Sequence, residues 1–100
     1  MEQLPLGILV GLLKGRTEFL QSIIEKPELV PLVEERAMLR SIIDQFATWD
    51  TKKSNNAITG LVRRQLMDTG KEHVQIAQEL LMLADGKIRT LLRSTNRVKR

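Results

Sequence analysis

The sequence predicts an all-α protein, a three- or four-helix bundle with a long C-terminal helix, which we expect to be oligomeric. The apolar content of 42% comes mostly from Leu, Ile, Val and Met, with only 3% aromatic residues and no Tyr, a composition that favours helices over strands. Apolar residues also recur at helical spacing along most of the chain. A chain of 100 residues buries a smaller share of its surface than a larger protein does, which favours self-association.

The first predicted helix covers residues 5–26. Its apolar residues, from Leu6 to Ile24, fall on one broad arc of a helical wheel, and Pro27 ends the pattern. Gly7, Gly11 and Gly15 fall on the polar side of the same wheel.

The second predicted helix covers residues 31–49. Pro31 suits a first helical turn, and apolar residues repeat at helical spacing as far as Trp49. The segment that follows, residues 50–56, has no apolar residue and predicts a loop, with Asn55 or Asn56 as the N-cap of the next helix.

The third predicted element covers residues 57–93, where apolar residues keep one constant phase. Gly70 could break it into two helices by capping the first, which would give a four-helix bundle. We favour a continuous helix, because a break need not have preserved the phase. Such a helix would be roughly 54 Å long, against roughly 30 Å for each of the others, and its overhang would bury apolar surface against another subunit. Residues 94–100 lack periodicity and predict a basic flexible tail, so residues 1–93 form the single helical domain.

The most apolar run, from Leu4 to Leu13, predicts the start of a core helix. A secretory signal needs basic residues before its apolar run, whereas Lys14 and Arg16 follow this one. The run also stops at Lys14, well short of the roughly 20 residues that span a bilayer. The absence of cysteine permits a reducing compartment, and we expect a cytoplasmic protein without a transmembrane span.

Catalytic and metal chemistry find little support in the sequence. His73 is the only histidine, and Thr69, Gly70, Ile76 and Ala77 occupy the positions three and four residues away, so no pair of metal ligands exists within its helix. Nucleophile motifs and glycine-rich phosphate-binding motifs are absent. We therefore expect no enzyme, no cofactor and no metal, and we interpret His73 as a buried or interfacial residue.

Arg16 falls at the centre of the first helix's apolar arc, where a charge is costly unless it is paired. One interpretation is an internal pair with an acidic residue such as Glu35. The other is that Arg16 meets a carboxylate or phosphate on a partner. The three glycines indicate either a weakened solvent-facing surface or a second contact face. An interfacial membrane helix is less favoured, because Lys14 and Lys26 are matched by Glu18 and Glu25.

Charge is distributed unevenly along the chain. Residues 1–50 hold 5 basic and 8 acidic residues, whereas residues 51–100 hold 11 basic and 4 acidic residues. Binding of phosphate backbones or of an acidic protein would therefore use basic residues of the second half, namely Arg63, Arg64, Lys87, Arg89, Arg93, Arg97, Lys99 and Arg100. The absence of aromatic residues from this half argues against base stacking. A DNA-binding helix-turn-helix around Gly70 fits poorly, because its second helix would have only a narrow polar face to place in the DNA groove.

These observations favour a non-enzymatic, oligomeric protein-interaction or assembly module, with a nucleic-acid-binding oligomer as the alternative. The candidate interface residues are Arg16, His73, Leu80, Leu83 and Leu91. The expected partners are a second copy of the chain, an acidic protein or nucleic acid.

Overall fold

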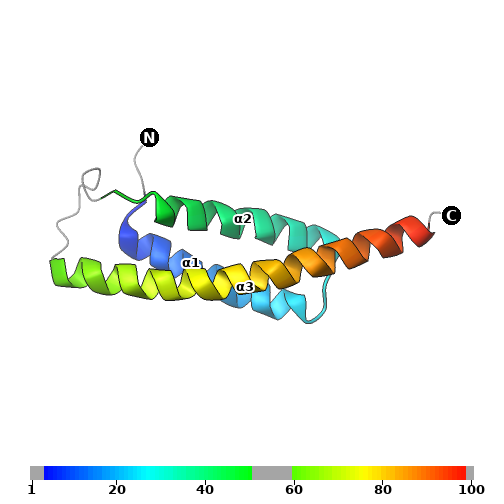
Figure 1. Cartoon of the computed structure of the whole chain (residues 1–100), viewed down its shortest axis with the longest axis horizontal. Helices are drawn as coiled ribbons and strands as arrows, with labels where there is room; N and C mark the ends of the chain where they lie inside the picture. The colour runs from blue at the N-terminus through cyan, green and yellow to red at the C-terminus, as the bar shows by residue number, and fades with distance from the viewer. Residues whose placement is uncertain (1–3, 51–59, 99–100) are drawn as a thin grey trace.

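In the computed structural model, three helices pack side by side (Figure 1). The structure describes residues 4–50 and 60–98, with side chains up to Ser94. Helices α1 (Leu6–Ile24) and α2 (Leu29–Ala47) have 19 residues each, and α3 (Gly60–Val98) has 39. The predicted helical bundle with a long C-terminal helix is confirmed, and α3 extends past both ends of the other two helices (Figure 1).

The first two helices begin and end where proline and local hydrogen bonds dictate. Helix α1 starts after Pro5, whose carbonyl accepts the Leu9 N–H at 3.0 Å. Helix α2 starts two residues earlier than predicted, since Pro31 sits in its first turn, where a missing N–H costs no hydrogen bond. It also ends two residues earlier, at Ala47, so Trp49 lies outside it. The Trp49 indole N–H donates to the Leu4 carbonyl at 3.2 Å and so joins the end of α2 to the start of α1.

Helix α3 is continuous through Gly70, which corrects the alternative of a four-helix bundle. It also continues to Val98, five residues beyond the predicted helix end at residue 93, and so extends into the segment 94–100 that was predicted as a basic flexible tail. Residues 94–98 contain no glycine or proline that would stop a helix. The predicted loop after Asp50, its N-cap and the predicted helix start at Ala57 all lie outside the described residues.

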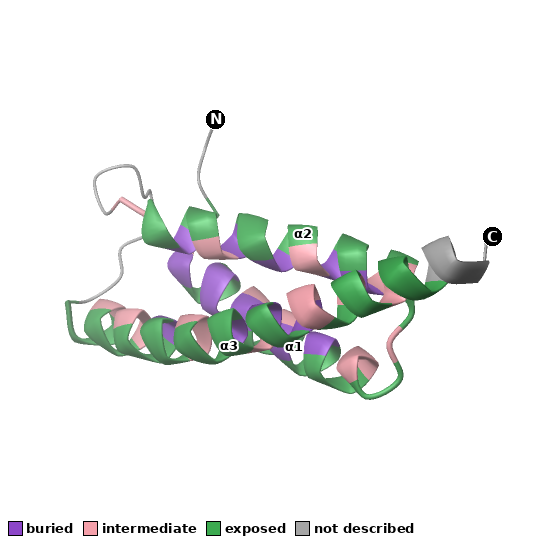
Figure 2. Cartoon of the chain, turned by 45° about the vertical axis from the view of Figure 1, so that its right-hand side comes forward, coloured by how far each residue is buried: buried purple, intermediate pink, exposed green. Residues whose placement is uncertain are grey.

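The core lies where the three helices overlap (Figure 2). Helices α1 and α2 supply leucines that are fully buried: Leu6, Leu9, Leu13, Leu20, Leu32 and Leu39. Helix α3 instead buries small residues seven positions apart, Gly70, Ala77 and Ala84, together with Leu81. Small side chains let the axis of α3 approach its neighbours closely. Gly70 is the tightest case, since a Cβ there would lie 2.2 Å from a ring carbon of Phe46 on α2.

Candidate interaction surfaces

Arg16 and Glu35 form an ion pair between α1 and α2. The Arg16 guanidinium donates to Glu35 Oε2 at 3.4 Å, and the side chains are 39% and 6% exposed, respectively. Burial raises the pKa of the Glu35 carboxyl, although the nearby Arg16 charge partly opposes this shift. Glu35 Oε1 is buried without a hydrogen-bond partner among the described residues. The internal partner predicted for Arg16 is thus confirmed.

A groove of about 700 Å³ runs between α1 and α2 beside this ion pair. Leu12, Met38 and Ile42 give it an apolar floor, and Arg16 and Glu34 lie at its margins. Exposed Ile8 and Phe19 extend the apolar surface along α1.

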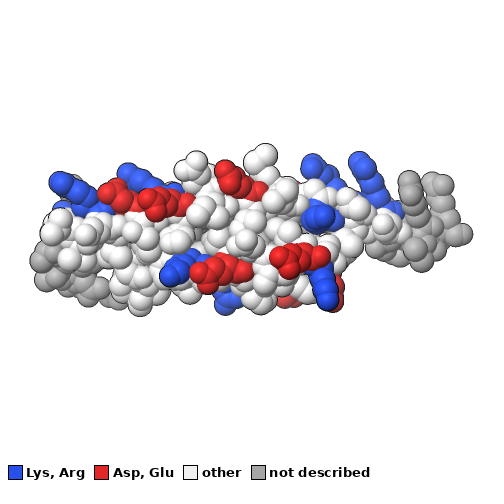
Figure 3. All heavy atoms as spheres, turned by 90° about the horizontal axis from the view of Figure 1, so that it is seen from below, with Lys and Arg blue, Asp and Glu red and all other residues white. Residues whose placement is uncertain are grey.

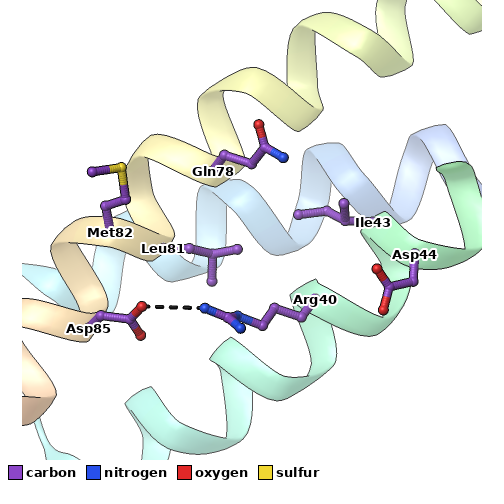
Figure 4. Close-up of a pocket in the computed structure, with 7 residues that line it drawn as sticks. All are labelled: Arg40, Ile43, Asp44, Gln78, Leu81, Met82 and Asp85. Atoms are coloured by element: carbon purple, nitrogen blue, oxygen red, sulfur yellow. Dashed lines mark hydrogen bonds and ion pairs between the residues drawn. The ribbon is translucent and has the colours of Figure 1, made fainter.

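A second groove, of about 500 Å³, lies between α2 and α3 (Figure 4). Its polar rim is an ion-pair cluster that the sequence did not predict: Asp85 of α3 forms an ion pair with Arg36 of α2 and accepts a hydrogen bond from Arg40 of α2 at 3.3 Å. Leu81 and Ile43 line the apolar part of the groove. Asp85 lies one residue after buried Ala84 and four after Leu81, and this position beside the core stripe is the signal that could have identified it.

The face formed by α1 and α3 is different, since an uncharged band runs along it between two rows of charged side chains (Figure 3). On α1 the glycines Gly7 and Gly11 have no neighbouring atom within 4 Å of an added Cβ, so this part of the surface is open. On α3 the side chains of Ile76 and Leu83 are 46% and 57% exposed. A surface that has charged borders and exposes apolar side chains between them is typical of a protein-binding face.

The predicted interface residues of α3 differ in exposure. Leu83 is exposed, whereas His73, Leu80 and Leu91 are half-buried. Leu80 and Leu91 pack against the core, so much of their apolar surface is already used within the chain.

The predicted basic residues do not form one patch. Arg63, which is half-buried, and exposed Arg64 lie near the start of α3, about 36 Å along the helix from Lys87. Lys87 and Arg89 are both exposed, but at about 100° per residue they point to opposite sides of α3. Arg93 is also exposed. The side chain of Arg97 and the whole of Lys99 and Arg100 lie outside the described residues.

No group of His, Asp and Glu within residues 4–50 and 60–94 could hold a metal ion. None of the described helices is long and apolar enough to cross a membrane. The chain matches no protein-family model, no curated protein and no solved structure.

Proposed function

We propose that this chain is a non-enzymatic helical module that works by assembling with protein chains. The uncharged band on the α1–α3 face carries this proposal (Figure 3). Proteins that act alone rarely expose large continuous apolar patches, and an apolar patch with a polar rim commonly marks a binding surface. The exposed side chains of Ile76 and Leu83 on α3 would contribute apolar area once a partner covers them.

Binding of nucleic acid has less support. A phosphate backbone attracts a basic patch or stripe, but here the basic side chains of α3 are divided between its two ends and between opposite sides of the helix. Acidic residues, including Glu72 and Glu79, occupy the stretch between the two basic ends.

Light scattering coupled to size-exclusion chromatography, together with sedimentation velocity, tests the proposal from low micromolar to several hundred micromolar protein. We expect a mass above that of one 11.4 kDa chain, rising with concentration to a plateau. A single-chain mass at every concentration would contradict assembly with itself. A parallel titration with duplex DNA and with RNA at low salt tests the alternative, which predicts binding that weakens steeply as salt is added.

A further inference from the structure

Helix α3 carries an exposed stripe next to its buried one. At about 100° per residue, eight exposed residues fall within roughly 60° of one another around the helix: Gln65, Thr69, Glu72, Ile76, Leu83, Lys87, Thr90 and Ser94. Asp85 and Gln78, which line the groove with α2, lie on the other side of the buried stripe. The exposed stripe therefore borders α1 and belongs to the α1–α3 face.

The spacing within this stripe is symmetric about a point between Glu79 and Leu80. Ile76 and Leu83 lie equally far from that point, and so do the pairs Glu72 and Lys87, and Thr69 and Thr90. When two antiparallel helices are related by a two-fold axis, each residue lies opposite its mirror position in the other copy. With the axis at this point, Ile76 would meet Leu83 of a second copy, and Glu72 would meet its Lys87.

Charge favours this arrangement over a parallel one. A parallel pair would place Glu72 beside Glu72 of the other copy and Lys87 beside Lys87, whereas the antiparallel pair places opposite charges together at both sites. Neither side chain forms an ion pair within the part of the chain that the structure describes. On the outer flank of the stripe, exposed Asp68 and Arg93 fall at nearly mirrored positions and would form a further opposite-charge pair.

The neighbouring surface of α1 leaves room for this contact. Gly70 packs on Phe46 of α2, and Trp49, three residues after Phe46, donates to the Leu4 carbonyl, so Gly7 lies at about the level of Gly70. Since α1 and α3 run in the same direction (Figure 1), the stretch from Gly7 to Gly15 runs alongside the stretch of α3 that begins near Gly70 and contains Ile76. Gly7 and Gly11 have no side chain to obstruct a second copy.

We infer that a second copy of this chain binds the exposed stripe of α3, with the two α3 helices antiparallel and the two-fold axis near Glu79 and Leu80. The inference rests on the proposed function and specifies its partner and geometry. It pairs Ile76 with Leu83 and Glu72 with Lys87 twice across the axis. Near the axis, Glu79 would lie close to Glu79 of the second copy, and this like-charge pair is the unfavourable contact of the interface.

Charge reversal tests the pairing. Glu72→Lys and Lys87→Glu should each weaken self-association about tenfold or more, because each replaces two opposite-charge pairs with two like-charge pairs. The double variant should restore most of the affinity. Glu34→Lys, the same charge change on the exposed surface of α2, is the matched control and should leave association unchanged. Circular dichroism of every variant checks that its helices are intact.

Spin labels test the orientation, and the cysteine-free chain makes single-site labelling straightforward. Labels at Glu79→Cys should lie close together in the dimer, whereas labels at Ser94→Cys should be separated by roughly 44 Å, from 1.5 Å of rise per residue. A dimer without charge rescue, or with short distances at both sites, would overturn the inference while leaving the proposed function standing. A chain that stays monomeric at every concentration would overturn both the inference and assembly of the chain with itself.

Discussion

Replacing Gly70 with alanine should destabilise the fold, although alanine is the better helix former. An added Cβ would lie 2.2 and 2.3 Å from two ring carbons of Phe46, compared with the 3.5–4.0 Å at which carbon atoms attract each other. Phe46 is 6% exposed and has core residues around it, so its ring has little space to move. Overpacking of this kind costs about 1–3 kcal/mol, and the helix propensity of alanine returns about 1 kcal/mol.

Gly86 provides the matched control, because it lies in the same helix and an added Cβ there meets nothing within 4 Å. Gly86→Ala should therefore stabilise the protein by up to about 1 kcal/mol. The difference between the two variants, about 1–3 kcal/mol, isolates the clash with Phe46. Urea unfolding followed by circular dichroism measures both, and shortening the ring in Gly70→Ala/Phe46→Leu should recover part of the loss. Equal stability of the two alanine variants would refute the close approach of α2 and α3.

The other predictions concern charge, glycine and concentration. Glu35→Gln should raise the melting temperature at neutral pH and lose this advantage in acid. The pKa of Glu35 is raised in the folded state, so the protonated side chain favours folding and the charged one opposes it as pH rises. Melting curves of both proteins across pH test this dependence. Asp85→Asn should lower the free energy of unfolding in urea by about 0.5–1 kcal/mol, since the ion pairs of Asp85 with Arg36 and Arg40 are partly exposed. Gly15→Ala, on open surface, should gain up to about 1 kcal/mol in the same assay. A chain that folds as a dimer should melt about 3–6 °C higher for each tenfold rise in concentration, and scanning calorimetry at two concentrations detects this.

Much of the fold could be predicted because its determinants are local. Pro27 lies in the turn between α1 and α2, Pro31 lies in the first turn of α2, and apolar spacing marks the three helices. The pairing of Arg16 with Glu35 was also predictable, since both residues interrupt apolar arcs and each needs an opposite charge.

Gly70 shows where local reasoning fails. A glycine between two apolar stretches fits a helix cap and equally a position of close packing. Only the position of Phe46, which is 24 residues away in the sequence, decides between them. The tertiary contact overrides the local preference, and so the choice between three and four helices could not be made from the sequence alone.

The exposed stripe was predicted only in part, since Leu83 was a candidate interface residue and Ile76 was not, for a related reason. Apolar residues of α3 cover such a broad arc that Ile76 and Leu83 merge with the core positions on a helical wheel. The structure separates them, because the buried positions are held by Gly70, Ala77 and Ala84, whose small side chains bring α3 close to its neighbours. The larger side chains of Ile76 and Leu83, beside this buried stripe, stay outside the contact between α3 and its neighbours. Among the described residues of α3, Leu81 is the only large apolar side chain that is buried, whereas Ile76 and Leu83 are exposed. This is the distribution expected of a helix that needs a partner on its second face.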